Sequence, residues 1–145
     1  MKTELFYKNG MHFECHTRTI ISHIDATPEH GGKNLGPTPK ELLLQGAGGC
    51  SGIDIVSFLT KMRLTIKKFE IEIDAEQTDV APKHFKTVAL IYKLEGDIPP
   101  EKIIQATTLS MTKYCGVSYI LSLSCPIKYI VMLNGKKIYQ DQAKF

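Results

Sequence analysis

The spacing of apolar and polar positions changes several times along the chain, and each change predicts a secondary-structure element. An alternating pattern predicts two strands at the start, joined by a tight turn at Asn9-Gly10. Near the middle, Phe69 and Ile71 alternate with charged residues, which is typical of a half-buried strand. The strands expected from these patterns cover 4–8, 11–17, 18–25, 67–74, 85–94 and 127–133, and the last ten residues pair as an edge strand or fray.

A second pattern, with apolar residues around most of the helical circumference, begins after the Gly- and Pro-rich loop 26–37. Thr38 and Glu41 have the spacing of a capping box, so we expect the helix to begin there and to continue to Met62. Such a helix is buried in a core or between subunits. A second helix is expected from Pro99-Pro100 to Met111 and a short one over 117–123, which gives an α+β fold.

Length and composition limit the class of protein. The 145 residues suit a single domain over 1–145, and 43% hydrophobic content excludes a disordered chain. A net charge of +3, with both signs interspersed, argues against nucleic-acid binding. No uninterrupted apolar run approaches the roughly 20 residues of a membrane span, and the first residues lack a signal-peptide core. We therefore expect a cytoplasmic protein, and because one helix is too apolar for a single small sheet to cover, a homodimer.

Residues 46–52 contain four glycines around Cys50, and each costs about 1 kcal/mol of helix stability relative to alanine. Two explanations are open. In the first, the helix is continuous and another backbone passes close to it. In the second, the helix breaks and restarts at Ser51, which would place Cys50 at a helix N-terminus that favours a thiolate. In that arrangement Asp54 would oppose the thiolate, so a further cation would be needed.

Arg18 and Arg63 are the two arginines in the sequence. Arg63 lies thirteen positions after Cys50, about 20 Å along a helix, and is too far away. Arg18 is expected within a strand and is the candidate for a clamp on the site, or else a solvated surface residue. His16 and His23, on the strands flanking Arg18, are either surface or packed histidines or members of a Cys–His nucleophile pair.

The other cysteines give no metal-binding pattern. There is no Cys-x-x-Cys motif, so we expect no structural zinc site. Cys15 and Cys125 are expected to be packing residues. Cys115 lies where two helical segments meet and could cap a helix, pack, or face Cys50 and resolve its sulfenic acid.

Three motifs together resemble the OsmC/Ohr family of osmotically induced and organic-hydroperoxide-resistance proteins, most of all its OsmC-like branch. They are the Pro-led helix start, the small residues before a cysteine, and a second cysteine 65 positions later: Gly36–Leu44, Gly48-Gly49-Cys50 and Lys113–Ser118. The resemblance implies an α+β homodimer with long central helices wrapped by sheets and active sites at the subunit interface. It also implies a thiol peroxidase without haem, flavin or metal.

By matching position, the resemblance makes Cys50 the peroxidatic cysteine, Cys115 the resolving one and Arg18 the thiolate's partner. This sequence departs from the family pattern at Lys40, where the peroxidase branches have a glutamate. Glu41 is next to it, and either replaces that glutamate as the partner of Arg18 or closes the capping box. We expect an organic peroxide to contact an apolar lining, and a small or lipoyl-type dithiol to reduce the disulfide. That lining is expected from Leu43, Ala47, Ile53 and Phe58.

Two rival functions remain from the sequence. The first is a dimer of the same fold that binds a small molecule or is structural and does not turn over peroxide, which the Lys40 departure motivates. The second is a cysteine-dependent acyl transferase or hydrolase with a histidine base.

Overall fold

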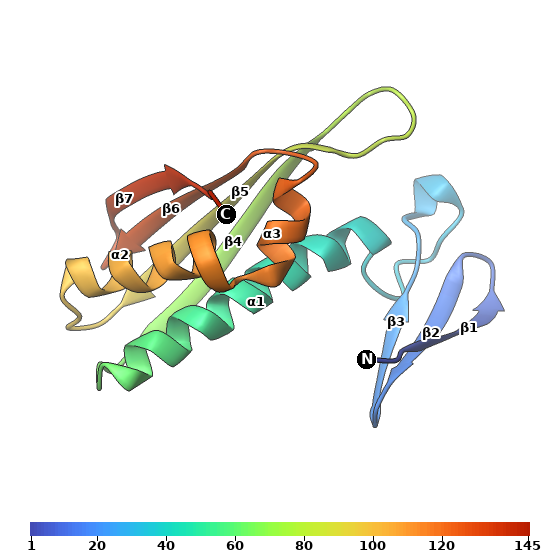
Figure 1. The fold of residues 1–145 in the computed structure, drawn as a ribbon. Helices are drawn as coiled ribbons and strands as arrows, with labels where there is room; N and C mark the ends of the chain where they lie inside the picture. The colour runs from blue at the N-terminus through green and yellow to red at the C-terminus, as the bar shows by residue number, and fades with distance from the viewer. The chain divides into compact units, whose positions relative to one another are not determined.

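The computed structural model describes residues 1–145, which form two compact units, Met1–Leu44 and Gln45–Phe145. The α+β class expected from the sequence is confirmed: the chain has two β-sheets and three α-helices. The helix α1 (Pro39–Lys61) begins in the first unit and continues into the second (Figure 1).

The first unit contains a three-stranded antiparallel sheet in the order β1 (Glu4–Asn9), β2 (His12–Thr17), β3 (Ile20–Ile24). The first turn falls one position later than Asn9-Gly10: Asn9 pairs with His12, and Gly10, with a φ of +54°, opens the two-residue turn. The placement of Arg18 within a strand is wrong. Arg18 opens the two-residue turn between β2 and β3, with a φ of +57°. This turn was not recognised because Arg-Thr contains none of the Gly, Asn or Asp residues that usually supply a positive φ there.

A buried carboxylate organises the loop that follows β3. Asp25, 2% exposed, accepts backbone N–H donations from Ala26 at 2.8 Å, Lys33 at 2.9 Å and Leu35 at 3.1 Å. These hydrogen bonds, that of Lys33 first, hold the pKa of Asp25 below its ordinary value. The loop also contains a short 3₁₀ turn, Pro28–His30.

The start of α1 is the predicted capping box. The Thr38 N–H donates to Glu41 Oε2 at 2.7 Å, and the Glu41 N–H donates to Thr38 Oγ1 at 3.4 Å. The bonds from the Thr38 backbone and then from its hydroxyl lower the pKa of Glu41. The carboxylate of Glu41 therefore already accepts the hydrogen bonds that cap the helix.

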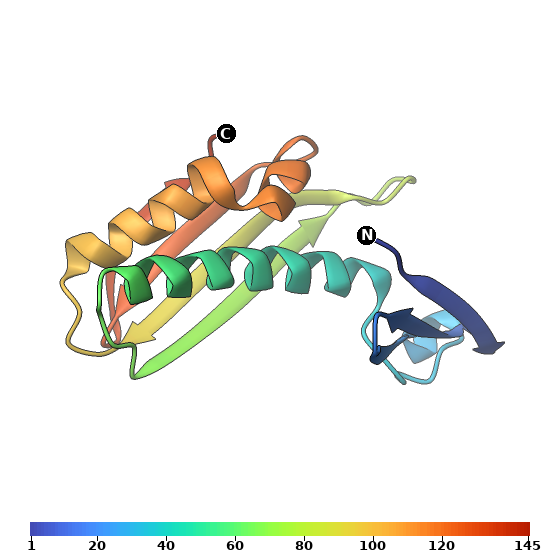
Figure 2. The same cartoon turned by 60° about the horizontal axis from the view of Figure 1, so that its bottom comes forward.

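The second unit is built on a four-stranded sheet, with three helices on one of its faces (Figure 2). β4 (Lys68–Gln77) pairs antiparallel with β5 (Phe85–Glu95), β5 pairs parallel with β6 (Ile127–Leu133), and β6 pairs antiparallel with β7 (Lys136–Gln142). A parallel pair needs a long crossover. Here it consists of α2 (Pro100–Leu109), a π-helical turn (Ser110–Tyr114) and α3 (Gly116–Ser122). β7 shows that the last residues do pair as an edge strand.

The sheet and the helices share a core whose largest fully buried side chains include Tyr92 and Tyr129. From α1 this core receives one side of the helix: Ala47, Gly48, Ser51, Gly52, Ile55 and Leu59. The expectation that α1 is buried all round is not met within one chain, since Ile53 is 72% exposed and Val56 41%. By length and composition alone α1 could cross a membrane, a property that it shares with core helices of soluble proteins.

Candidate active site

Cys50 lies in the middle of an unbroken helix. The alternative in which the helix restarts at Ser51 is wrong, because α1 runs continuously from Pro39 to Lys61. Ser51 does not cap a helix: its hydroxyl is bonded back to the preceding turn, 2.8 Å from the Ala47 carbonyl oxygen and 3.2 Å from that of Gly48. Cys50 therefore does not lie at an N-terminus of its own helix.

Two glycines of the cluster let α1 lie close to β4. A Cβ atom added at Gly48 would stand 2.5 Å from Ile73 Cδ1, and one added at Gly52 would stand 2.7 Å from Ile71 Cδ1. The continuous-helix explanation is thus correct in outline, but side chains of the sheet, rather than another backbone, occupy the space. Gly49 differs, since a Cβ there would meet nothing within 4 Å.

Cys50, Asp54 and Cys115 come together in the second unit. One ligand atom from each, the two Sγ atoms and a carboxylate oxygen, all lie within 4.8 Å of one another. Cys50 and Asp54 are one helical turn apart on α1 and partly exposed, whereas Cys115 is 1% exposed. The cluster offers three ligand atoms, one fewer than a structural zinc site has, and two of the three are thiol sulfurs.

Cys115 is held between the π-helical turn and α3. Its N–H donates to the Ser110 carbonyl at 2.9 Å, and its Sγ lies 3.0 Å from Ser118 Oγ and accepts the Ser118 N–H at 3.4 Å. Burial raises the pKa of the Cys115 thiol to about 11, against the smaller opposing effect of Ser118. Cys115 is thus a protonated thiol at neutral pH, and it donates to Ser118 Oγ while it accepts the Ser118 N–H.

Further hydrogen bonds, one partly and one fully buried, fix the geometry around the cluster. Ser110 Oγ donates to Asp54 Oδ2 at 2.9 Å. The Tyr92 hydroxyl donates to Ser51 Oγ at 2.8 Å, and burial raises the pKa of Tyr92. Ser110, Ser118 and Tyr92 were not identified from the sequence, because single serines and a strand tyrosine have no motif spacing. Asp54 carried a signal, its position one turn after Cys50.

The four residues expected to form the apolar lining differ widely in exposure. Ala47 is completely buried, Leu43 is 48% exposed, and Ile53 is the most exposed of the set. Phe58 packs edge-on against Tyr114, with 5.2 Å between ring centroids. An open apolar groove of about 490 Å³ does lie along α1 and β4, and it is lined by Gly48, Gly49, Gly52, Ile53, Val56, Ser57, Phe69 and Ile71.

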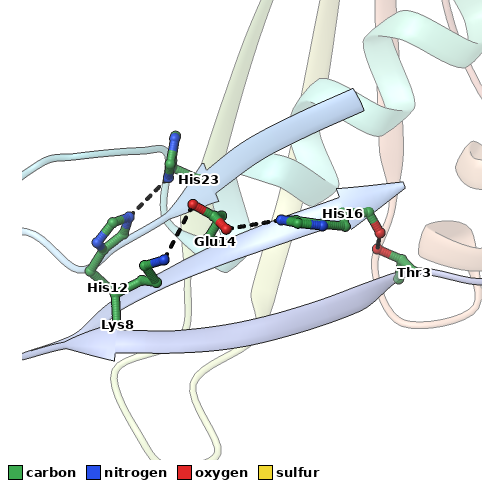
Figure 3. A network of polar contacts seen from close by, with 6 residues as sticks. All are labelled: Thr3, Lys8, His12, Glu14, His16 and His23. Atoms are coloured by element: carbon green, nitrogen blue, oxygen red, sulfur yellow. Dashed lines mark hydrogen bonds and ion pairs between the residues drawn. The ribbon is translucent and has the colours of Figure 1, made fainter. Parts of the chain in front are cut away.

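The histidine candidates take part in a polar network on the sheet of the first unit, to which Thr3 and Lys8 also belong (Figure 3). His23 Nδ1 lies 2.9 Å from His12 Nε2, and His16 Nε2 lies 2.9 Å from Glu14 Oε1 (Figure 3). Both candidate imidazoles therefore have hydrogen-bond partners within their own sheet.

The two remaining cysteines are packing residues, as expected. Cys15 is 5% exposed on β2, and Cys125 is 4% exposed, with its Sγ 3.8 Å from the Leu121 carbonyl oxygen. All four cysteines are free thiols.

The model of the OsmC-like protein family matches residues 31–130, a range that includes the Pro-led helix start, Cys50 and Cys115. The chain belongs to the OsmC-like family. Protein YhfA of Escherichia coli (strain K12) is 35% identical over 94 residues, which are 64% of this chain and 70% of YhfA. The resemblance seen in the sequence motifs is therefore confirmed.

Solved structures of other OsmC-like folds agree with this assignment. A hypothetical protein from Aquifex aeolicus VF5 is 27% identical and has a TM-score of 0.78, over 92% of this chain and 96% of that one. An organic hydroperoxide resistance protein OsmC from Legionella pneumophila has a TM-score of 0.68 at 16% identity, over 90% and 95% of the two chains. At that identity the likeness shows the fold alone.

Proposed function

We propose that this OsmC-like chain is a thiol peroxidase that reduces organic hydroperoxides through Cys50 and Cys115. The observation that carries the proposal is the pairing of two unlike thiols, a partly exposed Cys50 and a buried Cys115, with sulfur atoms within 4.8 Å. Several proteins of this fold are named as organic hydroperoxide resistance proteins, including one from Elizabethkingia anophelis, which further supports the choice of substrate.

The reaction has two steps on the protein. The Cys50 thiolate attacks the distal peroxide oxygen, the O–O bond breaks, and an alkoxide leaves and is protonated to the alcohol. Cys50 is then a sulfenic acid, and the Cys115 sulfur attacks it to form a disulfide and release water. Arg18 is proposed as the cation that stabilises the Cys50 thiolate and the departing charge. The role of Glu41 as a partner of Arg18 stays a prediction.

The cycle closes when a small or lipoyl-type dithiol reduces the disulfide by thiol–disulfide exchange. Two thiols supply the electrons, so no haem, flavin or metal takes part in the proposed cycle. We also propose that the protein acts in the cytoplasm, a reducing compartment in which such a dithiol can be regenerated.

The test is single-turnover stopped flow with cumene hydroperoxide, followed by mass spectrometry without reduction. Wild type should consume one equivalent and lose two hydrogens, in a bond between Cys50 and Cys115. Cys50→Ser should consume none, and Cys115→Ser should stop at the sulfenic acid. Cys125→Ser is the control, because it removes a buried thiol outside the cluster, and it should behave as wild type. Equal, slow consumption by wild type and Cys50→Ser would leave the alternative, a dimer without peroxidase turnover.

We also propose that a second copy of the chain covers the exposed side of α1 and completes the site. Support comes from the apolar groove beside α1, the exposed Ile53 and the open space over Gly49, where another backbone can approach closely. Strand β1 is exposed along its whole length and is a further surface that a partner could cover.

Light scattering during size-exclusion chromatography tests the dimer. Wild type should elute with twice the mass of one chain, and Ile53→Glu should shift it to the monomer because a buried, unpaired charge costs several kcal/mol. Ile53→Leu keeps the apolar contact and should remain dimeric. A wild type that is monomeric at micromolar concentration would contradict the proposal.

A further inference from the structure

We propose that Asp54 is a further catalytic residue of this site, and that its carboxylate carries a proton from Cys115 to the leaving hydroxide when the disulfide forms. The inference rests on the proposed peroxidase function and deepens it, because it assigns the second chemical step to a group outside the two cysteines.

The geometry places Asp54 close to both reacting sulfur atoms. A carboxylate oxygen lies within 4.8 Å of both sulfurs, one of which must lose a proton while the other loses a hydroxide. That separation is within reach of a transfer through one water molecule. Asp54 is only partly exposed, so bulk water does not fully replace it as a proton acceptor.

The carboxylate is also oriented with respect to Cys115. The hydroxyl of Ser110, a fully buried residue, donates to Asp54 Oδ2 at 2.9 Å. The carbonyl of the same Ser110 accepts the Cys115 N–H at 2.9 Å. Ser110 therefore fixes both the proton acceptor and the backbone of Cys115, and a rotamer change of Asp54 would break a partly buried hydrogen bond.

The chemistry needs such a group. In the reduced protein burial raises the pKa of the Cys115 thiol to about 11, so at pH 7 this thiol carries a proton that it must lose as the S–S bond forms. Transfer of the proton to Asp54 lets the Cys115 sulfur use its electron pair to form the S–S bond as the S–O bond of the Cys50 sulfenic acid breaks. The hydroxide then takes the proton from Asp54 and leaves as water. The carboxylate is restored, and atoms and charge balance.

This assignment predicts opposite behaviour in the two steps. A carboxylate repels the neighbouring Cys50 thiolate, so removing its charge should leave the attack on peroxide as fast as in wild type, or faster. The same change should slow disulfide formation by about 10²-fold or more, the range of general acid–base catalysis. A residue that only supported the local structure would slow both steps together.

The experiment follows both steps in one rapid-quench series with cumene hydroperoxide and mass spectrometry, on wild type, Asp54→Asn, Asp54→Glu and Ser110→Ala. Asp54→Asn keeps the shape and can still accept the Ser110 hydroxyl bond, and its sulfenic acid should accumulate. Asp54→Glu should recover part of the second rate. Ser110→Ala, which frees the carboxylate, should slow that step less than Asp54→Asn does.

Disulfide formation at the wild-type rate in Asp54→Asn would overturn the inference and leave the peroxidase function standing. Equal slowing of both steps would also overturn it. A wild type in which Cys50 is never oxidised would overturn the proposed function itself, and the first step of the series reports this separately.

Discussion

Oxidation by one equivalent of an organic hydroperoxide is expected to raise the thermal stability of this chain. Cys50 and Cys115 lie 65 positions apart. A bond that closes a loop of this length reduces the entropy of the unfolded chain, which raises the free energy of that state by about 4 kcal/mol at 25 °C. Sulfurs within 4.8 Å must approach to about 2 Å, so strain in the folded state offsets part of that gain. A net stabilisation of about 2–4 kcal/mol should raise the Tm by roughly 5–15 °C for a chain of this size.

Differential scanning calorimetry on reduced, oxidised and re-reduced protein measures this shift. Dithiothreitol should reverse it, and Cys50→Ser or Cys115→Ser should show none. Cys125→Ser should shift as wild type does, since its buried thiol is not part of the cluster. An unchanged Tm in oxidised wild type, with both thiols still open to alkylation after denaturation, would refute the reasoning that joins these two sulfurs.

Three further predictions concern the scaffold. Gly49→Ala should stabilise the isolated chain by up to about 1 kcal/mol, because its methyl group enters open space. Gly48→Ala should be neutral or destabilise the chain by up to about 2 kcal/mol, because its methyl group meets Ile73. Urea unfolding measures the free energy of unfolding of both variants. Arg18→Gly should leave the free energy of unfolding unchanged or raise it by up to about 1 kcal/mol, because glycine adopts the positive φ without strain. The same variant should lower the rate of peroxide reduction, and Arg18→Lys is its control. Loss of stability without loss of rate would contradict both parts. The hydrogen bonds that lower the pKa of Asp25 stabilise the fold above about pH 4, and this stabilisation is lost as the pH falls through the folded-state pKa. Asp25→Asn should therefore lower the Tm measured at pH 7 and weaken the dependence of the Tm on pH below about pH 5.

Local signals accounted for most of the fold. The turn near Asn9-Gly10, the capping box of Thr38 and Glu41 and the alternation around Ile71 depend on neighbouring residues, so the sequence alone could show them. The hairpin turn at Arg18 was missed because its conformation is imposed by pairing of the flanking strands, against the preference of the residue itself.

The site was predicted in part. Cys50 and Cys115 were selected by motif, but their separation depends on how α1 and the π-helical turn pack, and no spacing rule encodes that. Asp54 was noticed only as a charge opposed to the thiolate. Its contact with Ser110 joins residues 56 positions apart, which sequence periodicity cannot reveal.

The 1% exposure of Cys115 also determines which reagents can reach the two thiols. An alkylating compound can reach the partly exposed Cys50 sulfur. Cys115 is protected because the surrounding atoms bury it and because its thiol is protonated. Chemical damage and labelling in the resting protein therefore fall on one sulfur, and the second stays intact for the moment when the first has taken up oxygen.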